Sequence, residues 1–135
     1  MSPLRVTWST SGFDEYLEQL DKAGKNVDEV APQALQAGAE VLLAGMAQRV
    51  PRDTGNLADH LGIYGPFQDV SDHFVYVGLW RGKNVSRELA IYATVMEFGS
   101  VHTPARSYIR ATLDQDGRKA RAAMVAVFKQ ELGLE

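Results

Sequence analysis

The chain has 135 residues and no cysteine. A length of this size predicts one domain, covering residues 1–135, which buries about two thirds of the unfolded surface and is stable without a metal or disulfides. The apolar fraction of 45% and the charged fraction of 23% argue against a disordered, fibrous or membrane-embedded protein. No apolar run approaches the roughly 18 residues that cross a bilayer, and no signal-type stretch follows Met1, so we expect a cytoplasmic chain with no membrane partner.

Charge is unevenly distributed, although the formal net charge is only -3. Residues 1–50 carry four basic and seven acidic side chains, residues 51–100 carry four and six, and residues 101–135 carry six and four. The chain lacks the surplus of Lys and Arg that displaces counterions from phosphates, so we expect no sequence-specific nucleic acid partner. An acidic first part and a basic last part would allow one copy to contact the next head to tail.

The first fifty residues predict a strand followed by two helices. Polar and apolar residues alternate from Leu4 to Trp8, which is typical of a strand with one face exposed to solvent. Ser11 is expected to cap a first helix that Gly24 ends. The apolar positions of this helix share one face and comprise Phe13, Tyr16, Leu17 and Leu20.

A longer helix follows, because apolar and small residues recur every three or four positions up to Met46. Asn26 and Glu29 match a capping box, but Pro32 lacks a backbone donor, so the helix begins near Asn26 or restarts at Ala31. Two glycines, Gly38 and Gly45, lie on its apolar stripe. We expect another element to approach the helix backbone closely there.

The second half of the chain alternates between turns, strand and helix. Pro51 and Gly55 mark a turn, and residues 57–62 fit either a helical turn or the start of a strand. A strand is predicted over residues 70–80, with both faces covered: Phe74 and Tyr76 on one, Val75, Val77 and Leu79 on the other.

A helix over residues 88–98 should end at Gly99. A last helix over residues 108–132, with Gly117 as a candidate break, should bury Ile109, Leu113, Ala120, Met124, Val127 and Phe128.

Two enzymatic patterns are present in part. Asp53-Thr54-Gly55 is the tripeptide of aspartic proteases, which a chain this short could complete only as a homodimer. Pro51 stands where the preceding strand should pair, so we interpret Asp53 as a turn and helix cap instead. His60, His73 and His102 lack the spacing of metal ligands. We therefore expect no catalytic residues, no metal and no cofactor.

A series of motifs in a fixed order carries a resemblance to a known family. An Ala-rich helix precedes Pro51-Arg52-Asp53-Thr54-Gly55-Asn56-Leu57; a strand ends in Val75-Tyr76-Val77-Gly78; Tyr92-Ala93 leads to Glu97-Phe98-Gly99; and Pro104-Ala105 precedes Tyr108-Ile109-Arg110-Ala111. This order resembles the tail-completion and head-to-tail joining proteins of long-tailed bacteriophages over roughly residues 34–113. The family pattern usually has a proline and a phenylalanine where this chain has Ser107 and Tyr108.

The resemblance implies an α+β fold, in which a small, mainly antiparallel sheet is packed by the long helix of the N-terminal half and by a C-terminal helix. It implies a non-enzymatic structural protein of a phage or prophage that forms a ring at the neck or tail end of the virion, after assembly in the host cytoplasm. Its partners would be other copies of itself and the tail and head-connector proteins. A tail-tube terminator or other minor tail protein, and a homodimeric Asp53 protease, are the alternatives.

The resemblance and the charges also select candidate interface residues. Phe98 is expected to anchor the loop after its helix, and Glu97 to pair with Arg106 or Arg110 and contribute to an interface. The loop from Arg81 to Arg87 should project and contact the acidic face of a neighbouring copy. The full set of structural and interface candidates is Pro51, Asp53, Thr54, Gly55, Leu57, Arg81, Lys83, Arg87, Tyr92, Glu97, Phe98, Gly99, Pro104, Tyr108 and Arg110.

Overall fold

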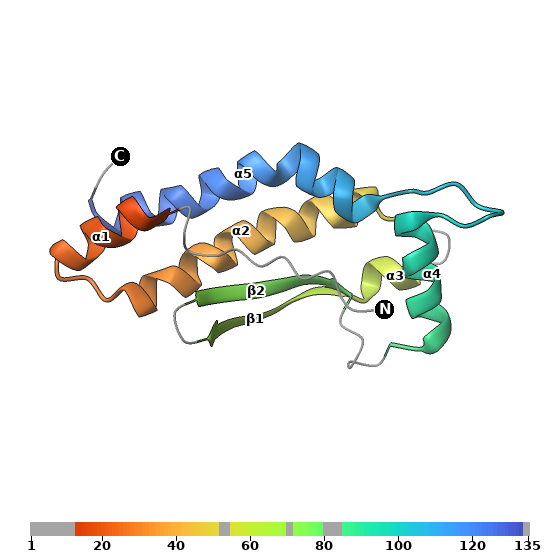
Figure 1. Cartoon of the computed structure of the whole chain (residues 1–135), viewed down its shortest axis with the longest axis horizontal. Coiled ribbons are helices and arrows are strands. Elements are labelled where there is room, and N and C mark those ends of the chain that lie inside the picture. Colours follow the sequence, from red (N-terminus) through yellow and green to blue (C-terminus); the bar gives the residue numbers. More distant parts are fainter. Residues whose placement is uncertain (1–12, 52–54, 70–71, 80–84, 134–135) are drawn as a thin grey trace.

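The computed structural model describes residues 13–51, 55–69, 72–79 and 85–133 (Figure 1). The elements follow in the order α1 (Asp14–Lys22), α2 (Val27–Arg49), α3 (Asn56–Asp59), β1 (Leu61–Asp69), β2 (Asp72–Leu79), α4 (Arg87–Phe98) and α5 (Tyr108–Glu131). The expected strand at Leu4–Trp8 and the cap at Ser11 lie outside the described residues. Within these residues, none of the helices combines the length and the apolarity that a membrane span requires.

Helix α2 is the centre of the molecule. It packs along α5 and also against both strands of the β1–β2 hairpin, while α1 lies beside α5 and α2 (Figure 1). Small residues on α2, among them Ala34 and Ala39, are fully buried and let its neighbours come close. A small antiparallel sheet packed by a long first-half helix and a C-terminal helix confirms the predicted α+β class.

The long helix begins at the earlier of the two predicted positions. Asn26 Oδ1 accepts a hydrogen bond from the Asp28 backbone N–H at 3.0 Å, which caps the first turn. Pro32 is the sixth residue of α2, so its missing N–H removes a single hydrogen bond, the one to the Asp28 carbonyl. The helix therefore runs unbroken through Pro32 and does not restart at Ala31.

The sheet is a two-stranded hairpin in which β1 pairs antiparallel with β2, Ile63 lying opposite Val77 and Phe67 opposite Phe74. Val75 and Val77 are fully buried on the face that meets α2. The other face carries Phe67, Phe74 and Tyr76, whose ring centroids lie 5.6 to 5.9 Å apart. Phe74 and Tyr76 are only half-buried, so this face is less covered than expected.

Two expectations for the last helix are wrong. The helix runs without a break through Gly117, and Leu113 is 37% exposed rather than buried. Thr112 takes the inward position, because its hydroxyl donates to the Tyr108 carbonyl at 2.6 Å and so needs no water. Ile109, Ala120, Met124 and Phe128 are buried, as predicted, whereas Val127 is only half-buried.

Gly45 confirms the close approach expected on α2. A Cβ at this position would lie 2.9 Å from Thr112 Cγ2 and 2.8 Å from Arg49 Nη1, and would also clash with the Asp116 carboxylate. A Cβ at Gly117, within α5, would meet nothing within 4 Å. The two helical glycines therefore differ in packing.

This contrast gives a matched pair of substitutions. Gly45→Ala should lower the free energy of unfolding by about 1–3 kcal/mol, because overpacking between α2 and α5 outweighs the gain in helix propensity. Gly117→Ala should raise it by about 0.5–1 kcal/mol, because it gains propensity without a clash. Urea unfolding followed by circular dichroism measures both, and a stabilised Gly45→Ala variant would contradict the packing of α2 against α5.

Candidate functional site

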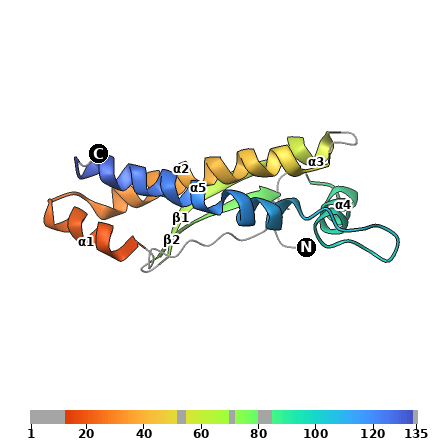
Figure 2. The same cartoon turned by 90° about the horizontal axis from the view of Figure 1, so that it is seen from above.

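Helix α4 and the loop that follows it form one end of the molecule. They lie opposite the end formed by α1 and the start of α2, and the loop between α4 and α5 extends beyond the helices (Figures 1 and 2). Ser86 Oγ caps α4 by accepting from the Leu89 N–H at 3.0 Å. Gly99 ends it, with φ of +80° and an N–H that donates to the Val95 carbonyl at 2.7 Å.

The Glu97 carboxylate connects the last turn of α4 to the first turn of α5. Oε2 accepts from the Ile109 backbone N–H at 2.9 Å, and Oε1 accepts from the Arg110 backbone N–H at 3.1 Å. The side chain is buried, so these amides and the positive end of the α5 dipole compensate its charge. Glu97 thus binds the backbone of α5 in place of the expected ion pair with an arginine side chain.

The chain between the two helices is held by further hydrogen bonds. The Arg106 N–H donates to the Met96 carbonyl at 2.6 Å, and Ser107 Oγ donates to the Glu97 carbonyl at 2.6 Å. Gly99 is required where the two arms of the loop approach, because a Cβ there would lie 2.9 Å from the Ala105 backbone nitrogen. The loop therefore leaves α4 and returns to α5 along a fixed path.

The tip of this loop is an ordered turn. The Ser100 N–H donates to the Thr103 carbonyl at 2.8 Å, and Ser100 Oγ accepts from the N–H groups of His102 and Thr103 at 3.3 and 3.1 Å. These bonds satisfy the polar groups of the turn internally. Val101, between them in sequence, is 96% exposed. The turn holds an apolar side chain in solvent.

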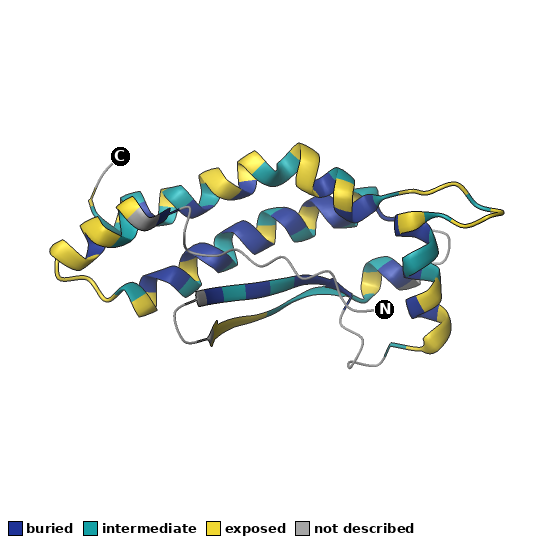
Figure 3. Ribbon diagram, in the orientation of Figure 1, coloured by how far each residue is buried: buried dark blue, intermediate teal, exposed yellow. Residues whose placement is uncertain are grey.

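Exposed apolar residues gather at this end of the protein. Of the five large apolar side chains that are exposed in the described residues, three belong to α4 and the loop: Ile91 at 53%, Phe98 at 71% and Val101 at 96%. We call these three residues the end patch. The sequence predicted that Phe98 anchors the loop, but the structure shows its side chain facing solvent. Figure 3 shows that much of α4 and of the loop is exposed.

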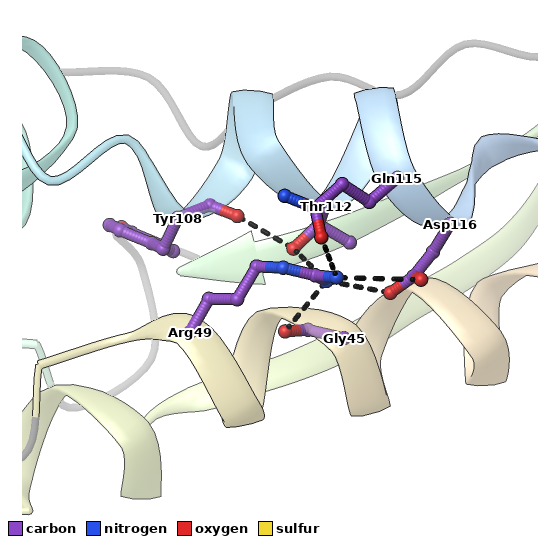
Figure 4. A network of polar contacts seen from close by, with 6 residues as sticks. All are labelled: Gly45, Arg49, Tyr108, Thr112, Gln115 and Asp116. Carbon is purple, nitrogen blue, oxygen red and sulfur yellow. Dashed lines mark hydrogen bonds and ion pairs between the residues drawn. The ribbon is translucent and has the colours of Figure 1, made fainter.

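A polar cluster next to the end patch fixes α5 on α2 (Figure 4). Arg49 Nη1 donates to Asp116 Oδ2 at 2.6 Å and to Thr112 Oγ1 at 3.3 Å, and Nη2 donates to Gln115 Oε1 at 3.0 Å. The hydrogen bond from Arg49 holds the pKa of Asp116 below its ordinary value of 3.8. Sequence reasoning missed this cluster, although an arginine in the last turn after Gly45 was a usable signal.

A surface depression of about 370 Å³ lies beside the cluster and is lined by Arg49, Arg106, Ser107, Tyr108, Ala111 and Gln115. Burial, and secondarily the Glu97 carboxylate, raise the pKa of Tyr108, so its phenol stays protonated at neutral pH. Within the described part of the chain, its Oη has no hydrogen-bond partner. Arg49 is engaged with Asp116, and Arg106 lies exposed at the depression.

Many of the predicted interface residues lie at the α4 end. Glu97, Phe98, Gly99, Pro104, Tyr108 and Arg110 lie at the junction of α4 and α5, with Arg87 exposed in the first turn of α4 and Tyr92 half-buried in its middle. Pro51 and Leu57 are buried on either side of Gly55, whose φ of +77° precedes α3. Asp53, Thr54, Arg81 and Lys83 lie outside the described residues.

The three histidines belong to separate elements. His60 follows α3, His102 is exposed in the loop, and His73 on β2 places Nε2 3.1 Å from Asp28 Oδ1. No group of three potential metal ligands forms within the described ranges. The contact between His73 and Asp28 ties the start of α2 to the hairpin.

One comparison with known proteins gives a match. A family model described as "Bacteriophage HK97-gp10, putative tail-component" matches residues 14–99, from α1 to the end of α4. Neither the curated proteins nor the solved structures contain a significant match.

Replacement of Glu97 tests the connection between α4 and α5. Glu97→Ala should lower the free energy of unfolding by about 1–3 kcal/mol, because two backbone amides lose a charged acceptor in a buried place. Glu88→Ala, at an exposed position of the same helix, should change it by no more than about 0.5 kcal/mol. Urea unfolding measures both changes, and equal effects of the two substitutions would contradict the role of Glu97.

The pKa of Asp116 predicts a dependence of stability on pH. Because the folded-state pKa lies below the unfolded one, the interaction with Arg49 is fully present above about pH 4 and is lost as pH falls through the folded-state value. The stability difference between the natural chain and Asp116→Asn should therefore shrink from pH 6 to pH 3, whereas that for Asp114→Asn, an exposed neighbour, should change less. Urea unfolding midpoints of the three proteins from pH 6 to pH 3 measure these differences. A stability difference for Asp116→Asn that stays constant across this range would contradict the pairing with Arg49.

Proposed function

The chain belongs to the HK97-gp10-like family of bacteriophage tail components, whose model covers well over half of it, and we propose that it completes the tail or joins it to the head at the neck of the virion. It is thus a structural protein of a phage or prophage, and the proposal concerns its place and its action there. In that place it would form a ring of identical copies between the tail and the head connector. The observation that carries the proposal is the end patch, which lies on α4 and a hydrogen-bonded loop. The start of α5 beside it is held by hydrogen bonds to the Glu97 carboxylate.

The end patch has the features of a protein contact surface. Exposed apolar side chains in a contiguous segment cost solubility, and soluble monomers seldom keep large patches of them. Here the chain uses Glu97, Ser107 and Gly99 to hold that segment in a defined conformation. A surface that is ordered before contact binds with a smaller loss of conformational entropy. These features support a role in assembly.

A non-enzymatic action is part of the proposal. Two carboxylates near the end patch already have partners within the fold. Glu97 binds two backbone amides, and Asp116 binds Arg49. The protease alternative depends on Asp53, which lies outside the described residues, so it is kept as an outcome of the experiment. Contact of the Arg81–Arg87 loop with a neighbouring copy also stays a prediction; Arg87 itself is exposed.

Deletion of this gene from its phage or prophage tests the proposal. We expect filled heads and separate tails in electron micrographs, because nothing would bridge the two structures. Expression of the natural chain in trans should restore joined particles, and this is the control.

Three other outcomes would contradict neck or tail completion. Tails of irregular length would favour a tail-tube terminator, and uncleaved structural proteins on a gel would favour the Asp53 protease. Finished, joined particles would exclude all of these roles.

A further inference from the structure

We propose that the end patch of one copy seats against the opposite end of the next copy, at Phe67 and the acidic start of α2. This inference rests on the proposed ring and adds the surface by which its copies meet. The occupant of the end patch is thus a second copy of this chain. Two features support it, namely apolar side chains exposed at both ends and charges of opposite sign around them.

The first end projects apolar groups among positive charges. Val101 stands at the tip of the turn and Phe98 at the end of α4, 96% and 71% exposed. Across residues 85–110, the exposed charged side chains are those of Arg87, Arg106 and Arg110 against that of Glu88, and the neighbouring α3 adds the exposed Asp59. Glu97 is buried and bound to backbone amides, so its charge is not presented to a partner.

The second end offers an apolar group among negative charges. Phe67 is 41% exposed and contacts the rings of Phe74 and Tyr76. Its neighbour Gln68 donates to Asp28 Oδ1 at 3.4 Å, which places this part of the hairpin beside the first turn of α2. The exposed acids of α1 and that first turn are Glu15, Glu18, Asp21, Asp28 and Glu29. The exposed cations are Lys22, Lys25 and Arg121 of α5, which lies over the Phe13 ring next to α1, so acids outnumber cations by five to three.

The two ends are therefore complementary in chemistry and opposite in charge. Apolar contact between Val101 or Phe98 and the Phe67 ring would supply the buried core of the interface, and the surrounding charges would select the orientation. A contact between two copies of the same end would instead bring arginine against arginine or carboxylate against carboxylate, which is unfavourable.

The positions of the two ends decide the type of assembly. The end patch lies at the α4 end of the long axis, and the first turn of α2, beside which Gln68 is held, lies toward the other end (Figures 1 and 2). A contact that joins different surfaces of identical subunits is heterologous, and it closes into a ring when the rotation between copies permits. A single pair of patches is thus sufficient to build a closed ring.

Disulfide cross-linking tests the contact, because the natural chain has no cysteine. A variant with both Val101→Cys and Phe67→Cys is expressed in the deletion phage, and purified particles are oxidised and analysed on a non-reducing gel. We expect a ladder of covalent multimers, since a disulfide forms only when the two Cα atoms approach to about 4.4–6.8 Å. The matched control is a chain with Val101→Cys and Ala44→Cys, which should give no ladder. Ala44 is exposed on α2 but belongs to neither of the two contact surfaces.

The outcomes separate this inference from the proposed function. If the chain is present in joined particles but the double variant gives no ladder, the contact is wrong and the neck role survives. Covalent dimers of Val101→Cys alone would show that two copies of the same end meet, which also overturns the contact. If the chain is absent from purified particles, the proposed function fails, and with it the ring on which the contact rests.

A second variant does not depend on cross-linking. Val101→Asp should leave folding unchanged by circular dichroism, because the side chain is almost fully exposed, and should cause a loss of joined particles. Normal numbers of joined particles with Val101→Asp would overturn the contact.

Discussion

The carboxylate of Glu97 is the interaction on which the α4 end of this protein depends. Two helices end and begin within ten residues of each other there, and each leaves backbone groups without helical partners. One buried side chain satisfies two of these donors in α5, while Met96 and Glu97 carbonyls accept from the loop. The negative charge is stabilised because it faces the positive end of a helix. Loop, turn and end patch are all positioned from this point.

Helix α2 supplies the rigid base for that arrangement. Its small residues allow α5 and the hairpin to pack closely, and Arg49 at its last turn fixes α5 by hydrogen bonds to Thr112, Gln115 and Asp116. The start of α5 is thus held twice, by Glu97 from α4 and by Arg49 from α2. A surface meant to recognise a partner benefits from such support, because less conformational freedom remains to be lost on binding.

Hydrophobic periodicity in the sequence predicted α2, α4, α5 and the buried face of β2, because one face of each contacts the core. It left residues 57–62 open between a helical turn and the start of a strand, and the structure has both, α3 followed by β1. It missed the rest of β1, where Gly65 and Pro66 interrupt the alternation typical of strands. It misplaced Phe98, because an aromatic residue at the end of an amphipathic helix is ordinarily buried and only the tertiary arrangement shows that nothing covers it. For Glu97 the sequence suggested an arginine partner, but its partners are backbone amides, which no pattern of side chains reveals.

The close contact at Gly45 has a consequence beyond the single subunit. In a ring built from contacts between opposite ends, the turn from one copy to the next includes the angle within each copy between its two contact surfaces. That angle includes the crossing of α2 and α5, where the missing Cβ of Gly45 leaves room for Thr112 and for the Arg49–Asp116 pair. The number of copies that close a ring would then depend on the packing between α2 and α5 inside each subunit, so that one added methyl group could alter the symmetry.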